Sequence, residues 1–219
     1  MTMTVLEFLR GPGLAVSVLV AVAGIAWRLY GIFRLGYRPD HSIPRGTDLW
    51  SGALRTIATR SSPPPAFSPR VLFAEITGIV FHLGLFVIIF GYRPHVEFVR
   101  RYLGFGWPAL PDSVVYFAGA LTMTTLLVVL LYRASHPVLR FLSNFDDYFS
   151  WFMTFAPVVT GMMAFEHHGA RNDALIAVHL ATVELLLLWI PFGKLSHFVL
   201  IFLARGTTGA LFARKGARS

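Results

Sequence analysis

The sequence predicts an all-α integral membrane protein: a bundle of five transmembrane helices with the N-terminus outside and the C-terminus in the cytoplasm. The chain has 219 residues, of which 55% are hydrophobic and 14% charged, and its mean hydropathy is +0.63. This is too apolar for a water-soluble domain of the same size. Two further observations support this prediction: several apolar windows are long enough to cross a bilayer, and the basic residues are unevenly distributed between the loops.

The predicted spans are five apolar windows near the roughly 20 residues that a helix needs to cross the hydrocarbon core. In chain order they cover residues 14–33, 72–92, 114–132, 149–165 and 174–204. The first window resembles a signal-peptide core, but it is long, has no basic leader and is followed by no small-residue cleavage site, so we expect a retained helix. No loop is long enough for a separate domain and no repeat is visible, so we expect one domain over 1–219.

Basic residues set the expected orientation. The net charge of +8 does not indicate a nucleic-acid partner, because these residues lie between apolar runs and not along one polar face. The positive-inside rule assigns the more basic loops to the cytoplasm. We expect the protein in the inner (cytoplasmic) membrane with membrane lipid as a partner, because the basic inner surface could contact anionic headgroups. The inward residues are Arg34, Arg38, Arg45, Arg55, Arg60, Arg70, Arg133, Arg140, Arg205, Arg214, Lys215 and Arg218; the outward ones are Arg10, Arg93, Arg100, Arg101 and Arg171.

Histidines within the spans are the candidate functional residues, because ionisable side chains in a membrane are costly and usually serve ligands, ions or protons. The chain has no cysteine, which excludes cysteine-ligated iron–sulfur clusters within it. His179 and His197 lie in the last span, and on a continuous helix they would share one face about 27 Å apart. His82 in the second span can oppose them, which is the geometry of two stacked haems.

Other interpretations of these residues stay open. His82 alone could bond to a neighbouring helix, and Gly78 and Gly84 could admit a macrocycle or simply allow tight helix packing. Glu75 and Glu184 could carry protons or pair with a histidine or arginine. The remaining histidines lie at span ends or in loops, where an imidazole costs little; they are His41, His136, His167 and His168, with His95 intermediate because Pro94 would turn the chain before it.

A family resemblance rests on two stretches of sequence. The run from His179-Leu180-Ala181 to Trp189-Ile190-Pro191-Phe192-Gly193-Lys194-Leu195-Ser196-His197 resembles the last helix of respiratory nitrate reductase γ subunits. Phe81-His82-Leu83-Gly84 leading to Phe90-Gly91-Tyr92 looks like the second helix of the same family. The resemblance covers essentially the whole chain. Cytochrome b subunits of heterodisulfide reductase-like and sulfite reductase-associated membrane complexes share the module, so it indicates a haem-bearing subunit and not its partner.

The resemblance implies two haem b groups stacked across the membrane. The inner haem would be held by His82 and His197, and the outer one by His179 and a histidine ten residues after His82. That position is Tyr92 here, so we expect His95 to supply the missing nitrogen after a turn; a differently ligated outer haem, or a single haem, are the alternatives. The lysine of the family's outer quinol site is also missing, since none lies around residues 111–113.

Lys194, three residues before His197, matches a basic position of the family. It could pair with a haem propionate, because ammonium and carboxylate groups attract strongly in a partly dry site. It could equally be a lysine that extends to the cytoplasmic interface.

We therefore predict an electron-transfer subunit and not a complete enzyme. It would pass electrons between quinone or quinol and iron–sulfur and catalytic subunits on the cytoplasmic side. Two other classes remain: a transporter or proton channel, in which the membrane histidines line a path, and a haem-free anchor for soluble subunits. Five spans without a repeat suit a transporter poorly.

Overall fold

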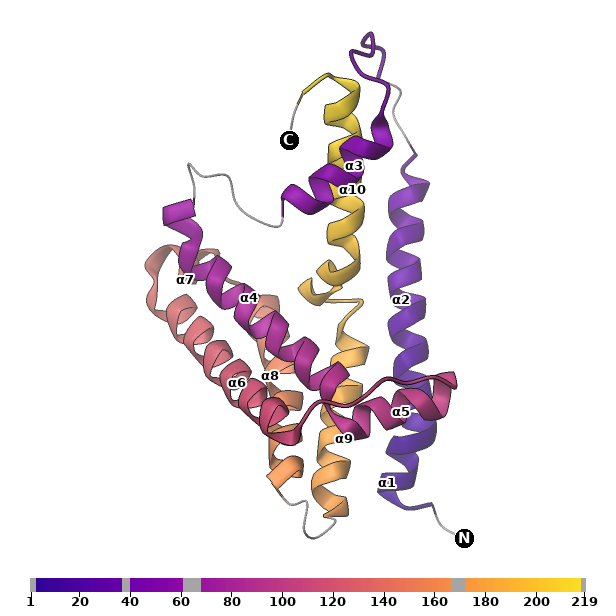
Figure 1. Cartoon of the computed structure of the whole chain (residues 1–219), viewed down its shortest axis with the longest axis vertical. Helices are drawn as coiled ribbons and strands as arrows, with labels where there is room; N and C mark the ends of the chain where they lie inside the picture. Colours follow the sequence, from indigo (N-terminus) through magenta and orange to yellow (C-terminus); the bar gives the residue numbers. More distant parts are fainter. Residues whose placement is uncertain (1–2, 37–39, 61–67, 167–171, 218–219) are drawn as a thin grey trace. The chain divides into compact units, whose positions relative to one another are not determined.

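The computed structural model describes residues 3–36, 40–60, 68–166 and 172–217, and these residues contain helices and loops but no strand. Helices make up most of the described residues (Figure 1). In chain order they are α1 (Val5–Phe8), a π-helical turn η1 (Leu9–Gly13), α2 (Leu14–Arg34), α3 (Leu49–Thr59), α4 (Ser68–Gly91), α5 (Arg93–Leu103), α6 (Asp112–Ser135), α7 (Pro137–Leu142), α8 (Phe145–Glu166), α9 (Asp173–Trp189), a 3₁₀ turn η2 (Lys194–Ser196) and α10 (His197–Arg214).

Five helical stretches among the described residues are long and apolar enough to cross a membrane, which confirms the predicted all-α class and the number of spans. Many large apolar side chains on these helices are exposed, as a lipid-facing surface requires. The protein is thus a multi-pass membrane protein. The stretches are Val5–Arg34, Val71–Gly91, Asp112–Ser135, Phe145–Phe165 and Lys194–Arg214.

The predicted last span over 174–204 is wrong as a single helix. Helix α9 ends at Trp189, and the backbone at Gly193 is extended before η2 and α10 begin. Pro191 explains the break, because a proline lacks the N–H that a helix needs and its ring clashes with the preceding turn. His179 and His197 therefore lie on different helices, and the even spacing along one helical face does not apply.

The chain forms two compact units: Met1–Val18 with Phe73–Trp189, and Leu19–Leu72 with Ile190–Ser219. The boundaries fall within α2 and α4 and at the end of α9. One domain over 1–219 stays a prediction.

In the first unit, α6 and α8 carry a core that includes Val115, Leu126, Met153 and Val158. Gly84 of α4 lies directly against Thr122 of α6, where a Cβ atom would overlap the threonine hydroxyl. Tight helix packing, one of the two roles expected for Gly84, is therefore the role that it has.

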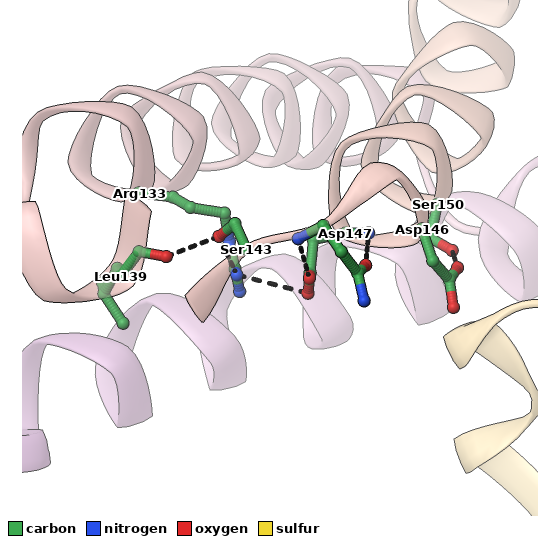
Figure 2. A network of polar contacts seen from close by, with 7 residues as sticks. Arg133, Leu139, Ser143, Asp146, Asp147 and Ser150 are labelled. Atoms are coloured by element: carbon green, nitrogen blue, oxygen red, sulfur yellow. Dashed lines mark hydrogen bonds and ion pairs between the residues drawn. The ribbon is translucent and has the colours of Figure 1, made fainter. Parts of the chain in front are cut away.

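Polar contacts fix the connection from α6 to α8 (Figure 2). Arg133 forms an ion pair with Asp147 at 3.2 Å and donates to the Ser143 hydroxyl at 2.9 Å. Ser143 in turn donates to the Leu139 carbonyl, and Ser150 donates to Asp146. Helices α6 and α8 are thus tied together at the end that the arginine distribution assigns to the cytoplasm.

In the second unit, α3 packs closely on α10 through small residues. Gly52 and Gly209 meet backbone to backbone, and the Thr56 side chain is buried beside Gly209. The segment before α3 is bound to the end of α10, because Arg214 donates to the carbonyls of Asp40 and Ser42. This loop is consequently part of a folded unit.

Candidate functional site

His95 and His179 face each other in the first unit. Their ring centroids are 6.2 Å apart and their planes differ by 22°. Imidazole nitrogens bind metal ions at about 2.0–2.1 Å, so two imidazoles on opposite sides of one metal ion have ring centroids about 6 Å apart. With this spacing, His95 of α5 and His179 of α9 could hold one haem iron between them.

The turn between α4 and α5 places His95. Tyr92 is the extended residue before α5, and Pro94 occupies its first turn, where a proline costs no hydrogen bond. His95 then lies with Nδ1 3.0 Å from the Ile88 carbonyl oxygen of α4. Because a carbonyl only accepts, Nδ1 carries the proton. Burial lowers the pKa of His95, which favours the neutral imidazole that a metal ion binds.

His179 is held by α8. Its Nδ1 lies 3.2 Å from the Thr160 hydroxyl, which itself donates to the Ala156 carbonyl at 2.9 Å. The hydroxyl can therefore accept from Nδ1–H and leave Nε2 as the ligand nitrogen. Gly161 makes room for the ring, because a Cβ atom there would lie 3.0 Å from His179 Cε1.

A cavity of ≈ 1360 Å³ adjoins this pair and lies wholly within the first unit. Ordinary small-molecule pockets span about 300–1,000 Å³, so the cavity has room for a large planar ligand. Its wall includes both histidines and many aliphatic side chains, with Arg10 and Arg101 as cations and Glu7 and Glu97 as carboxylates. A mainly apolar wall suits an apolar macrocycle, and a guanidinium group at its edge could pair with a carboxylate of such a ligand.

His82 and His197 are not brought together within one unit: His82 belongs to the first and His197 to the second. Both side chains are exposed. The Nδ1 atom of His82 lies 2.7 Å from the Gly78 carbonyl, and that of His197 lies 3.0 Å from the Lys194 carbonyl. Lys194 is exposed at the start of η2. Their pairing, and the role of Lys194, stay predictions.

The four predicted ligands share one local feature: Nδ1 of each is hydrogen-bonded to an oxygen that can accept. Metal-binding histidines are commonly oriented this way, with the second ring nitrogen left for the metal. His136 differs, since its buried Nδ1 has no hydrogen-bond partner in the described part of the chain. His41 is exposed, and His167 and His168 lie outside the described residues.

Two further polar residues lie inside the windows that the sequence predicts to span the membrane. Arg28 of α2, which the sequence analysis did not single out, donates to the Ser196 hydroxyl and to the Phe192 carbonyl. An arginine within the predicted window 14–33 was the signal that could have found it. Glu184 of α9 is 8% exposed, and both its carboxyl oxygens lie against Gly13.

Comparison with known proteins places the chain in a family. A curated protein of Nitratidesulfovibrio vulgaris strain Hildenborough, named simply "Protein", is 32% identical over 217 residues, which cover 95% of this chain and 93% of that protein. The chain belongs to the family of this protein. The match covers most of this chain and so includes residues of both units. No family model matches the chain, and no solved structure matches it.

Proposed function

We propose that the protein is a haem b-containing membrane subunit of a respiratory oxidoreductase complex. It transfers electrons between the quinone pool and an iron–sulfur partner subunit on the cytoplasmic face. The observation that carries the proposal is the His95–His179 pair, with centroids 6.2 Å apart beside a large apolar cavity. The resemblance to nitrate reductase γ subunits supports the same chemistry.

A haem b bound here supplies a one-electron iron centre. His95 and His179 would hold the iron through their Nε2 atoms, while the Ile88 carbonyl and the Thr160 hydroxyl fix the two rings. The mainly apolar wall would surround the macrocycle, and Arg10 or Arg101 could pair with its carboxylates. His82 and His197 would hold a second haem in the same way, with Lys194 near its propionates.

The proposed orientation follows the arginine distribution: the N-terminus outside and the C-terminus in the cytoplasm. The His95–His179 pair then belongs to the outer haem, and the loop before α3 and the end of α10 lie inside. Their basic residues would contact an iron–sulfur subunit or anionic lipid. Electrons from quinol oxidised near the outer face would move inward through the two haems.

Haem analysis of matched histidine variants tests the proposal. The protein is purified with its bound partners, and reduced-minus-oxidised spectra and pyridine haemochrome counts are recorded for wild type, His95→Ala, His179→Ala and His82→Ala. We expect two haems b in wild type, loss of the same haem in His95→Ala and His179→Ala, and loss of the other in His82→Ala.

His136→Ala is the matched control, because it removes an imidazole whose Nδ1 is not oriented by a hydrogen bond. We expect it to keep both haems. A wild-type protein without haem would contradict the cytochrome function and favour the anchor or the transporter. Two haems in both His95→Ala and His179→Ala would show that the outer haem is bound by other residues.

A further inference from the structure

Helix α3 lies against the last part of the span-length helix α10, within the second unit (Figure 1). Gly52 meets Gly209 backbone to backbone, and a Cβ atom at Gly206 would lie 3.7 Å from Cδ1 of Ile57. Because α10 ends at Arg214 and a helix rises 1.5 Å per residue, these contacts lie within about 12 Å of the end of the span. Helix α3 is therefore at the boundary between the hydrocarbon core and the headgroups.

One side of α3 is an apolar stripe. Trp50, Leu54 and Ile57 are spaced at i, i+4 and i+7, so they share one side of the helix. Trp50 is 83% exposed and Leu54 is 65% exposed. Ile57 is half-buried and reaches Gly206, which lies further from the end of α10 than Gly209. The exposed part of the stripe is thus continuous with a contact that lies inside the span.

The polar residues of α3 lie on the other side of the face that meets α10. Ser51, Arg55 and Thr59 follow one another at four-residue intervals and so form a second stripe, and all three are exposed. Arg60, directly after the helix, is also exposed, and its guanidinium carbon lies 5.8 Å from the ring centroid of Phe212 in α10. The helix thus presents apolar side chains on one side and arginines on the other.

The bilayer around α10 is the apolar medium nearest to this stripe. Phe198 and Phe202 of α10 are exposed, as lipid-facing side chains of a span are. A helix with one apolar side and arginines on its polar side is typical of helices that lie in the plane of the membrane interface. Tryptophan is enriched at this depth, and arginine side chains extend from it to the headgroups, where anionic lipid attracts them.

We propose that α3 is an interfacial helix that anchors the end of α10 in the membrane. Trp50 and Leu54 insert into the leaflet around α10, and Arg55 and Arg60 bind its anionic phospholipid headgroups. Because α3 is packed on α10, this binding fixes the depth of that end of the span. The occupant of the surface is lipid and not a protein partner, and the inference does not depend on haem.

Spin labels on single cysteines test the insertion. The chain has no cysteine, so Leu54→Cys, Arg55→Cys and Val22→Cys each take one label at an exposed position. Val22 lies well inside the span α2 and is the reference for lipid exposure. The purified protein with its bound partners is placed in nanodiscs of phosphatidylcholine with or without phosphatidylglycerol. Electron paramagnetic resonance then measures collisions of each label with oxygen, which concentrates in lipid, and with a water-soluble nickel chelate.

With phosphatidylglycerol present, we expect the oxygen-to-nickel ratio of the label at residue 54 to approach that at residue 22, and the ratio at residue 55 to be much lower. The ratio at residue 54 should fall when phosphatidylglycerol is left out. It should fall equally in phosphatidylglycerol nanodiscs when Arg55→Gln and Arg60→Gln are added, because α3 then loses its attraction to the headgroups.

Equal access of the nickel chelate to residues 54 and 55 would overturn the insertion. Protection of residue 54 from both reagents would overturn the lipid occupant and assign the stripe to a protein partner. An unchanged ratio without phosphatidylglycerol would overturn the binding of anionic headgroups. Trp50→Cys repeats the test on the same stripe if Leu54→Cys does not fold. Haem content, counted on the same samples, tests the proposed function separately.

Discussion

At the scale of single residues, four histidines carry the proposed haem chemistry, and each has its Nδ1 atom hydrogen-bonded to an oxygen. The type and position of His82, His95, His179 and His197 could be read from the chain. The hydrogen-bond acceptors of these imidazoles could not all be predicted from the sequence, because Ile88 lies across a turn and Thr160 lies on another helix. Arg28 was missed for the same reason: its partners are far away in sequence.

Gly161→Ala should disturb the His179 site. The new methyl group would lie 3.0 Å from Cε1 of the imidazole, and overpacking of this kind costs about 1–3 kcal/mol. We expect a lower content of the outer haem and a changed resonance signal. Gly31→Ala is the control, since a Cβ atom at Gly31 has nothing within 4 Å. Equal haem content in the two variants would show that the ring has room to move.

Gly13→Ala should strain the contact between η1 and α9. A Cβ atom at residue 13 would lie 2.9 Å from each carboxyl oxygen of the buried Glu184, so we expect a loss of about 1–3 kcal/mol in thermal unfolding in detergent. The double variant with Glu184→Ala should recover part of this loss, because the two residues are in contact. Additive effects of the two substitutions would refute the contact.

At the scale of elements, one of two proline-containing helix ends was predicted and the other was not. The turn at Pro94 was expected and is present. The break at Pro191 was not, although Pro191 and Gly193 are plain in the sequence, because hydropathy over 174–204 measures transfer into lipid and says nothing about backbone continuity. Four of the five predicted spans match helices closely, and the fifth is divided.

The loop before α3 predicts a pH effect. Hydrogen bonds from Ser42, followed by the charges of Lys215 and Arg214, hold the pKa of Asp40 below its ordinary value of 3.8. A lowered pKa in the folded state stabilises the fold above the unfolded value and is lost as pH falls through the folded value. Asp40→Asn should therefore unfold more easily than wild type at pH 7, with the difference vanishing below about pH 3.8.

Asp48→Asn is the control for this pH effect. It removes a carboxylate from the same loop but keeps a good residue at the N-terminal cap of α3. Thermal unfolding of the three proteins across pH measures both effects. A difference between wild type and Asp40→Asn that does not change with pH would contradict an electrostatic role for Asp40.

At the scale of the whole molecule, five span-length helices define a multi-pass membrane protein, and its orientation is open to direct measurement. The chain has no cysteine, so the labelling of a single introduced cysteine can be measured without background from other thiols of this chain. Ser42 and Phe105 are exposed in loops that the arginine distribution assigns to opposite sides. They are therefore suitable positions for labelling.

In intact cells, a membrane-impermeant maleimide should label Phe105→Cys and leave Ser42→Cys unlabelled until the cells are opened. This outcome follows from an outer N-terminus and a cytoplasmic C-terminus. Labelling both thiols after detergent treatment controls for access. The reverse pattern in intact cells would invert the orientation, and with it the side on which a partner docks.

The hydrogen bonds that orient the four histidines differ in whether they depend on the side chain of the partner residue. Gly78, Ile88 and Lys194 each contribute a main-chain carbonyl, which any amino acid at the same position still provides. Thr160 alone contributes a side chain. Relatives at about one-third identity can therefore replace Gly78, Ile88 and Lys194 and keep these hydrogen bonds. A substitution of Thr160 that removes the hydroxyl would instead remove the hydrogen bond to Nδ1 of His179.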